Sequence, residues 1–492
     1  MRPKILRFLL MFILAMYVIA PVSVIAQDAV KAAAEEVAES AETTEPAAEA
    51  AAEEEAELTP EEEAELTPEE VAEALSPEDK TAFVFNTLLF LIGGFLVMWM
   101  AAGFAMLEAG LVQSKNVSMQ CLKNVMLYAV AGIMFWVVGY NMMYDIEAGA
   151  FFGMPSPYDL GETFTEGYSV PSDWFFQMVF CATTASIVSG TVAERIKFWP
   201  FIIFTVVLTG IIYPIVGSWQ WGGGYLAERG FSDFAGSTLV HSTGGWAALT
   251  GALILGARHG KYGKDGSIKP MVASNIPLAT LGTFILWLGW FGFNGGSQLA
   301  LGTVEDATAV SNIFVNTNLA ACGGVVMAVL LCQVLYGKID VTMALNGALA
   351  GLVAITAEPL APSAWASILI GAVGGLIVVF TVPILDKLKI DDVVGAIPVH
   401  LVAGIFGTLV VAVHTQTSYM NDAGEKVKRT IGEQLVEQAV GVGLTAVFVG
   451  VVSTALWLLL KFTIGIRVSE EHEREGLDKA EVGVASYPEF VN

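Results

Sequence analysis

The two stretches that decide the fold are DFAGSTLVH, residues 233–241, and DVVGAIPVH, residues 392–400. Each begins with an aspartate, ends with a histidine after seven intervening residues, and leads into a long apolar segment. A histidine inside a membrane span is costly to bury, so it usually serves a function. Two of them at matched places predict a duplicated bundle whose interior carries the functional site. For either histidine alone, a core residue hydrogen-bonded to a carbonyl is the structural alternative.

The composition is typical of a polytopic membrane protein. The chain has 492 residues, of which 55% are hydrophobic and only 15% are charged, and its mean hydropathy is +0.63. The sequence has no nucleotide-binding GxxxxGK[ST] motif, no GxSxG elbow and no HExxH motif. We therefore expect that the protein is not an enzyme, uses no metal or other cofactor, and binds no nucleic acid.

Apolar runs near 20 residues long predict an all-α fold of eleven membrane-spanning helices. Five fall in the first half, five in the second and one at the end, over residues 83–107, 125–144, 174–192, 198–219, 238–257, 272–291, 312–335, 344–358, 365–385, 398–414 and 439–462. Since five is odd, related halves must lie inverted across the bilayer, so we expect two inverted five-helix repeats plus a final helix. Such repeats would bring His241 and His400 together near the midplane, where inverted-repeat transporters hold their substrate.

Basic residues in the predicted loops indicate the orientation. Alternate loops carry 15 Lys and Arg on one side and six on the other. The positive-inside rule therefore places the N-terminus outside and the C-terminus in the cytoplasm. We expect a plasma membrane location, the inner membrane in a bacterium, with residues 80–464 in the lipid bilayer and residues 465–492 as a cytoplasmic tail.

The N-terminal region is predicted to be an exported acidic arm. Residues 1–26 have a basic start, a short apolar run and a small-residue end, as a cleavable signal peptide does; an uncleaved anchor is the alternative. Residues 27–79 are rich in Ala and Glu, and residues 1–79 carry 16 of the chain's 25 net negative charges. We expect the arm to be extracytoplasmic and disordered, either as a spacer or as a surface that concentrates cations.

Residues near the two motifs indicate how a small cation could be handled. A buried neutral imidazole can donate from one ring nitrogen while it accepts at the other. Asp233 lies near Trp221 in the sequence, and a carboxylate behind an aromatic face holds a monovalent cation by charge and cation–π attraction. N-capping of the following helix is the alternative role for Asp233 and for Asp392.

Aromatic residues and a scarcity of charge indicate a dry path. Phe180 and the cluster of Trp287, Trp290, Phe291 and Phe293 are candidates to wall off a pore, with belt or packing positions as the alternative. Apart from the two histidines, the predicted span interiors contain almost no ionisable side chains. An ion would find no replacement for its hydration there, so we expect the species that crosses the middle to be neutral.

Several stretches of the chain follow one another in the order of a known family of membrane proteins. They are GTVAERIKF (190–198), WGGGYL (221–226), DFAGSTLVHSTGG (233–245), GWFGFNGGS (289–297), DDVVGAIPVH (391–400) and GIRVSEEHEREGLD (465–478). Over residues 80–479 the chain thereby resembles the ammonium transporter family, from whose usual double glycine it departs at Ser237. The related Rh proteins share the histidine pair, but Trp221 and the DFAG run fit the Amt branch better.

The resemblance implies a set of site residues and partners. The implied residues are an outer cation site of Trp221, Ser297, Phe176 and Gln177 supported by Asp233, a stacked phenyl gate of Phe180 and Phe293, and a pore lined by His241 and His400. The family also implies a homotrimer with one path per protomer, and docking of a cytoplasmic PII-type regulatory protein. In the tail, Glu470 and Arg474 are spaced for an i, i+4 ion pair, although a tail that only packs beneath a neighbouring protomer is the alternative.

Together these observations predict an ammonium transporter. Ammonium would bind outside as a cation, lose a proton before the apolar stretch, and cross as ammonia beside the imidazoles, with separate proton transfer through the histidine pair as a further hypothesis. An ammonium sensor that signals to a cytoplasmic partner is the alternative, and the short tail after Ile464 disfavours it. A potassium channel would need a carbonyl- or carboxylate-ringed filter, and the sequence has no TVGYG-like loop.

Overall fold

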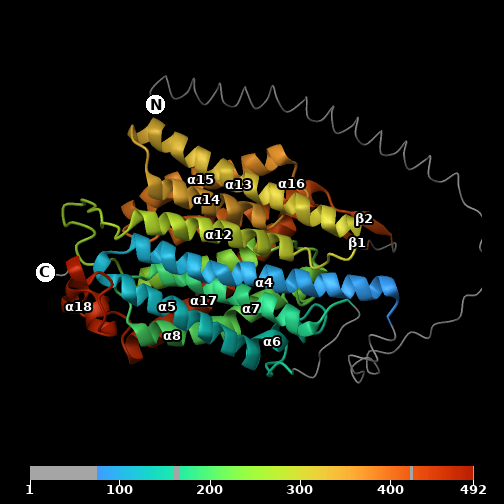
Figure 1. Cartoon of the computed structure of the whole chain (residues 1–492), viewed down its shortest axis with the longest axis horizontal. Helices are drawn as coiled ribbons and strands as arrows, with labels where there is room; N and C mark the ends of the chain where they lie inside the picture. The colour runs from blue at the N-terminus through green and yellow to red at the C-terminus, as the bar shows by residue number, and fades with distance from the viewer. Residues whose placement is uncertain (1–74, 160–166, 421–424, 491–492) are drawn as a thin grey trace, which may run out of the picture. The chain divides into compact units, whose positions relative to one another are not determined.

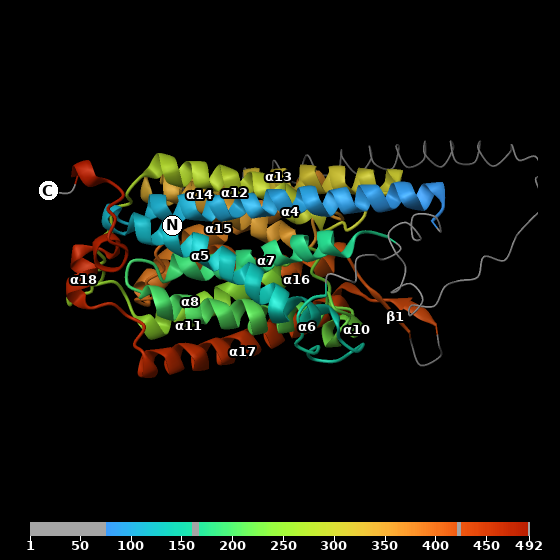
Figure 2. The same ribbon diagram turned by 60° about the horizontal axis from the view of Figure 1, so that its bottom comes forward.

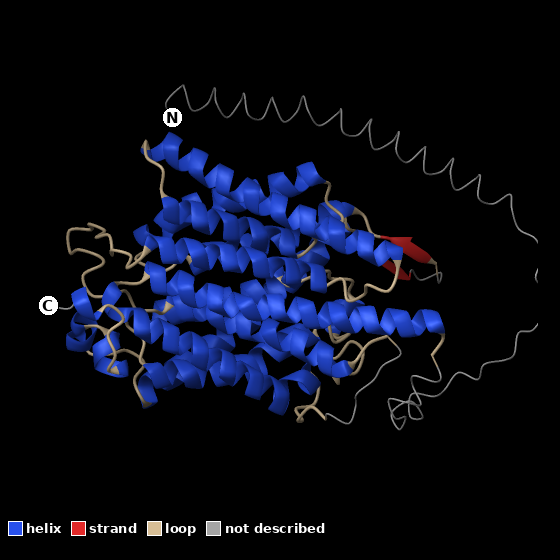
Figure 3. Ribbon diagram, in the orientation of Figure 1, coloured by secondary structure: helices blue, strands red, loops and turns tan. Residues whose placement is uncertain are grey.

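Long helices make up most of the structure (Figure 1, Figure 3). The computed structural model describes residues 75–159, 167–420 and 425–490, all of which lie in the unit Thr67–Asn492. The predicted signal peptide and nearly all of the acidic arm therefore lie outside the described residues. Helix α4 (Pro77–Leu111) begins slightly before the predicted boundary at residue 80, because the Ser76 hydroxyl caps it by accepting a hydrogen bond from the Asp79 amide.

The helices after α4 form a bundle of long rods. Their bounds are α5 (Val117–Met134), α6 (Tyr140–Tyr144), α7 (Val170–Thr191), α8 (Phe198–Val207), α9 (Tyr213–Ser218), α10 (Tyr225–Glu228), α11 (Thr243–Leu255), α12 (Ile276–Gly296), α13 (Val304–Tyr336), α14 (Val341–Thr356), α15 (Ala364–Lys387), α16 (Ala403–His414), α17 (Ile431–Thr463) and α18 (Glu470–Glu475). The π-helical turns η2 (Phe135–Gly139) and η3 (Leu208–Ile212) join α5 to α6 and α8 to α9. Within the described ranges, eight rods are long and apolar enough to cross a membrane.

The two ends of the bundle carry different features. At one end lie the start of α4 and a two-stranded antiparallel sheet of β1 (Ser418–Met420) and β2 (Lys426–Lys428), and at the other lies α18 (Figure 1, Figure 2). We call these the hairpin end and the tail end. The predicted helical architecture is confirmed, but the sequence did not reveal this hairpin, because three-residue strands are too short to give a periodic signal. The fold is otherwise helical.

Small residues hold α13, α14 and α15 in close contact. A methyl group added at Gly371 in α15 would lie 1.8 Å from the Ala320 carbonyl oxygen in α13, and one added at Gly347 in α14 would lie 2.7 Å from the Gly324 carbonyl oxygen. No side chain fits in those spaces, so the helix backbones pack directly against one another. The GxxxG-like spacings in α14 and α15 thus mark a seam of glycines between three helices.

The two histidine motifs fold into the same local structure. Each histidine lies in a π-helical turn, η4 (Ser237–Ser242) before α11 and η5 (Ile397–Val402) before α16. The Asp233 carboxylate accepts hydrogen bonds of 2.7–2.9 Å from four amide groups, those of Gly236, Ser237, Thr238 and Leu239. Asp392 accepts from the Ile397 amide at 2.7 Å and from the Thr191 hydroxyl at 3.0 Å. Both aspartates therefore cap the turn that carries the histidine.

The helices α11 and α16 run in opposite directions past each other. Beyond the end of α11, the Arg258 amide donates to Asp391, which lies just before η5. Beyond the end of α16, the Thr417 hydroxyl donates to the carbonyl oxygen of Gly230, a few residues before η4. Each histidine lies early in its own helix, so this antiparallel arrangement brings the two rings together inside the bundle.

Substitution of Asp233, which caps η4, tests its structural role. Asp233→Ala leaves four buried amides without an acceptor, and an unpaired buried donor costs about 1–3 kcal/mol. We expect a clearly lower midpoint of thermal unfolding in detergent and poor assembly, with partial recovery in Asp233→Asn. Asp265→Ala, at an exposed loop position, is the matched control and should change the midpoint little. Normal assembly and an unchanged midpoint for Asp233→Ala would contradict the capping role.

Candidate functional site

A cavity opens at the hairpin end of the bundle and has a volume of about 340 Å³. Its lining is mostly aromatic, and its residues are Phe90, Tyr140, Tyr144, Tyr168, Asp173, Phe176, Gln177, Phe180, Trp221, Phe234, Ser297 and Leu299. We call it the hairpin-end cavity. The four residues that the family resemblance implies for an outer cation site all line it, together with the first phenyl group of the implied gate.

Local hydrogen bonds hold the cavity wall in place. The Trp221 indole Nε1–H donates to the Asp233 carbonyl oxygen at 3.1 Å, and the Ser297 hydroxyl donates to the Phe293 carbonyl oxygen at 2.8 Å. The Trp221 ring meets the Phe180 ring edge-on, with 6.2 Å between centroids. Asp233 itself is fully buried behind this wall and does not line the cavity, so it positions Trp221 rather than touching the contents.

An aspartate that sequence reasoning missed also lines the hairpin-end cavity. Asp173 in α7 is only 6% exposed, and its carboxylate accepts from the Tyr140 hydroxyl at 2.7 Å and the Gln177 amide at 3.1 Å. The buried hydroxyl of Tyr144, on the same lining, has no hydrogen-bond partner in the described ranges. The sequence contains a signal for this pair, since Asp173 and Gln177 are four residues apart and therefore lie on one face of a helix. The cavity thus combines a carboxylate with the aromatic faces that attract a cation.

Two stacked phenyl rings close the cavity at its inner side. The Phe180 and Phe293 rings lie 3.9 Å apart between centroids, at an interplanar angle of 23°. Phe180 is 1% exposed and Phe293 is fully buried, so the rings leave no open passage between them. The two residues implied as a gate therefore form one stacked pair.

The paired histidines lie directly behind the phenyl rings. The Nδ1 atoms of His241 and His400 are 3.2 Å apart, so one donates and the other accepts according to the tautomer. The His241 ring stacks on Phe293 at 5.2 Å and on Trp290 at 5.0 Å, while the Trp290 indole N–H donates to Thr356 at 2.8 Å. Within the described part of the chain, the buried His241 Nε2 atom has no hydrogen-bond partner. The pair thus presents a free ring nitrogen in apolar surroundings.

A narrow void and a second cavity continue the path toward the tail end. The void, about 10 Å³ in volume, is lined by His400 and by Phe104, Leu107, Glu108, Ser186, Ile187, Gly190, Asn346, Leu349, Val394, Ala396 and Val399. We call it the histidine void. The cavity beyond it, the tail-end cavity, measures about 180 Å³ and shares Asn346 and Val394 with the void. Asp392, the second aspartate of the paired motifs, lines this tail-end cavity.

The expectation that the span interiors carry almost no ionisable groups beyond the histidines was wrong at both ends of the path. Besides Asp173, the interior holds Glu108 in α4, which is 1% exposed, and Lys123 in α5, which is fully buried. The sequence reading assigned these two residues to a span boundary and a loop, because the apolar run ends near them. Between these ionisable groups lie the stacked rings of the phenyl pair, of the two histidines and of Trp290.

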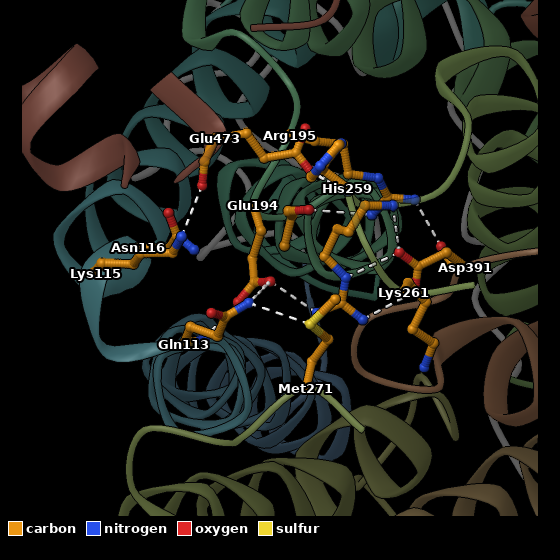
Figure 4. Close-up of polar contacts among 12 residues, drawn as sticks. Gln113, Lys115, Asn116, Glu194, Arg195, His259, Lys261, Met271, Asp391 and Glu473 are labelled. Carbon is orange, nitrogen blue, oxygen red and sulfur yellow. Dashed lines mark hydrogen bonds and ion pairs between the residues drawn. The ribbon is translucent and has the colours of Figure 1, made fainter. Parts of the chain in front are cut away.

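Polar contacts at the tail end tie several loops together (Figure 4). The Arg258 guanidinium pairs with Glu194 at 2.7 Å and with Asp391 at 2.9 Å, and all three side chains are buried. Burial alone would raise the pKa of Asp391, but hydrogen bonds from Arg258 and the positive charges of Arg195 and Arg258 hold it well below its usual range. Asp391 therefore stays ionised and fixes the loop that leads into η5.

The tail packs against these loops. The Lys115 ammonium group donates to the Glu473 carbonyl oxygen at 2.7 Å, and the Asp478 carboxylate accepts from the Met119 amide at 2.9 Å. Glu470 and Arg474 form the i, i+4 ion pair that their spacing predicts, at 2.5 Å. Both side chains of that pair are more than half exposed, so the pair contributes little to stability.

Comparisons with known proteins agree with this architecture. The sequence profile of the Ammonium Transporter Family matches residues 88–487. Ammonium transporter Amt2 of Archaeoglobus fulgidus is 42% identical over 431 residues, which cover 85% of this chain and 90% of that protein. A putative ammonium transporter of Synechocystis is 38% identical over 412 residues, 82% of this chain and 89% of that protein.

Solved structures give the same result. A structure described as "Sensor Amt Protein" matches with a TM-score of 0.76 and 38% identity, and the match covers 81% of this chain and 98% of that one. Mep2 of Candida albicans matches with a TM-score of 0.71 and 26% identity over 81% of this chain and 89% of its own. The chain therefore belongs to the ammonium transporter family and is a membrane protein that transports ammonium.

Proposed function

We propose that ammonium binds in the hairpin-end cavity as a cation, loses a proton near the phenyl pair, and passes the histidines as neutral ammonia. The observation that carries this proposal is the order of groups along the path. A cavity with a carboxylate and aromatic faces comes first, then the closed pair of Phe180 and Phe293, then two imidazoles in contact. A permanent charge would lose its hydration in that middle stretch without replacement, which costs many kcal/mol.

Deprotonation explains how the path selects its substrate. Potassium is similar in size to ammonium but carries no proton that it could give up, so it cannot become neutral. The imidazole nitrogens offer hydrogen-bond partners to ammonia, and no described residue bonds to the His241 Nε2 atom. Selection on this basis is chemical and does not require a pore of exact diameter. The released proton either returns to the outside or follows through the histidine pair.

Asp173 adds charge to the cation site that the family resemblance implies. Its carboxylate accepts hydrogen bonds from neutral donors, Tyr140 and Gln177, and these leave its negative charge uncompensated. At the lining of a narrow cavity with low-dielectric walls, such a charge raises the local concentration of cations. We assign it the recruitment of ammonium, with Trp221 and Phe176 supplying ring faces.

The arrangement of the helices supports eleven membrane spans, with the hairpin end on the outer side of the membrane. Three further helices, α7, α11 together with η4, and α14, lie in the bundle with the eight apolar rods. α7 is less apolar because its buried faces carry Ser and Thr, but it contributes Phe176 and Phe180 to the path. An odd number of crossings fits the placement of the start of α4 and of α18 at opposite ends (Figure 1). The matched turns η4 and η5 support inverted five-helix repeats.

We also propose, from the family resemblance, a homotrimer in the plasma membrane and docking of a PII-type regulator at the tail end. A sensor role is the second candidate, and the similarity to the structure described as "Sensor Amt Protein" is the observation in its favour. The cavities on both sides of the histidines favour passage of a solute, because a sensor needs only one of them.

Substitution of the histidines tests the proposed path. In liposomes that contain the purified protein, ammonium uptake is measured in the presence of excess potassium. His241→Ala or His400→Ala should abolish this uptake or should let potassium through. His414→Ala, at the end of α16, is the matched control and should retain selective uptake. Unchanged selectivity in both pore variants would remove the pair from the mechanism.

Substitution of Asp173 tests the recruitment step separately. Asp173→Asn removes the negative charge but keeps the shape, so the KM for ammonium should rise about tenfold, which corresponds to about 1.4 kcal/mol, while the maximal rate changes little. Asp145→Asn, at an exposed position near the same end, is the control and should leave both values unchanged. A fall in maximal rate at constant KM would contradict a role in recruitment.

A further inference from the structure

A buried carboxylate shares the histidine void with His400. Glu108, near the C-terminal end of α4, is 1% exposed and lines this void together with the His400 ring. The Glu108 Oε2 atom accepts three hydrogen bonds, from Gln120 at 2.6 Å, Asn124 at 3.1 Å and Ser189 at 2.8 Å. The Glu108 Oε1 atom is buried and has no hydrogen-bond partner among the residues that the structure describes. One oxygen is therefore anchored, and the other is free to accept a proton.

A buried lysine lies close to the Glu108 carboxylate. The Lys123 ammonium group is fully buried and donates to the Ser189 carbonyl oxygen at 2.8 Å, while the Ser189 hydroxyl donates to Glu108. Ser189 thus lies between Lys123 and Glu108, and the positive charge of Lys123 balances the negative charge of the carboxylate in a region of low dielectric. A purely structural ion pair would be expected to use both carboxylate oxygens, because an unpaired buried acceptor is costly.

The space between Glu108 and His400 has the size of a single water site. The void measures about 10 Å³, and a water molecule needs about 10–15 Å³ of such space and two or more polar partners. Glu108, Ser186, Asn346 and His400 are the polar residues of the lining. Because Asn346 also lines the tail-end cavity, the void leads from the histidines toward the tail end.

We propose that Glu108 accepts the proton that leaves the histidine pair and passes it on toward the tail-end cavity. This inference rests on the proposed function, since it requires that a proton taken from ammonium reaches the pair. A ring N–H bond of protonated His400 breaks, and the proton moves through the bridging water to the Glu108 Oε1 atom. A neutral imidazole and a neutral carboxylic acid remain. The acid then gives its proton to water of the tail-end cavity and becomes a carboxylate again, so ammonia and proton leave by separate routes.

The test compares two readouts on full-length protein in liposomes that receive an external ammonium pulse. Capacitive current on a solid-supported membrane reports charge movement, and a lumenal pH dye reports ammonia that enters without its proton, because such ammonia binds a proton inside. Glu108→Gln should lower the current about tenfold, as expected for loss of a proton-transfer group, while the lumen becomes more alkaline than with the unsubstituted protein, in which the accompanying proton offsets the ammonia. Glu78→Gln, the same change at an exposed position of α4, should keep the current within about twofold.

The outcomes separate this inference from the proposed function. Loss of the current without alkalinisation of the lumen in a Glu108→Gln protein that assembles normally would overturn the proton role and make Glu108 a structural residue of the path. Unchanged current would also overturn it. Ammonium entry without any current in the unsubstituted protein would overturn the proton route but leave transport intact, whereas no entry at all would refute the proposed function.

A second variant covers the case in which Glu108→Gln does not assemble. Glu108→Asp keeps the charge beside Lys123 but withdraws the free oxygen from the void by about one bond length, ~1.5 Å. The current should then fall about threefold or more, and the lumen should become more alkaline than with the unsubstituted protein. A current equal to that of the unsubstituted protein would contradict the proposal.

Discussion

The contact between two buried imidazoles is the constraint on which the rest of the structure depends. His241 and His400 meet at 3.2 Å only because two antiparallel helices begin with the same π-helical turn. Each turn is held by an aspartate that satisfies amide groups which the turn leaves open. The capped turn thus fixes where a polar ring enters an apolar interior, and two capped turns fix the distance between the rings.

Charge along the path is confined to its two ends, and the physics of the bilayer explains why. An ionised side chain is tolerated where water or a partner is near and becomes costly toward the centre. Asp173 meets this condition at the hairpin-end cavity, and Glu108 meets it beside Lys123 and three neutral donors. The rings between them provide contacts without net charge. The charged ends of the path suit a cation and its uncharged middle suits a neutral molecule, so the path suits a solute that changes its charge state on the way.

The sequence predicted the features that depend on pattern. The apolar runs indicated long helices, and the spacing of the two motifs indicated that His241 and His400 meet. The family resemblance placed Trp221, Phe176 and Ser297 around one cavity, where the structure has them. The roles of these residues stay predictions, as do the number of spans and the inverted repeats.

The features that the sequence did not reveal depend on tertiary contacts. Whether Lys123 faces water or the interior depends on α4, α7 and α8, which cover it. From the sequence alone, a charged residue near the end of an apolar run is assigned to a loop. The same holds for Glu108, whose three donors come from α5 and α7. The π-helical turns were not predicted because each is only about one turn long, too short for its longer period to be read from the sequence. The hairpin of β1 and β2 is too short for any periodicity.

The glycine seam between α13, α14 and α15 has a mechanical consequence. Where backbone touches backbone, as at Gly371 and Ala320, no rotamer can change to absorb a displacement. These three helices therefore form a stiff frame, and an opening motion is easiest for side chains that can change rotamer. The stacked rings of Phe180 and Phe293 belong to α7 and α12, outside the seam, and can swing while the frame behind them keeps its shape.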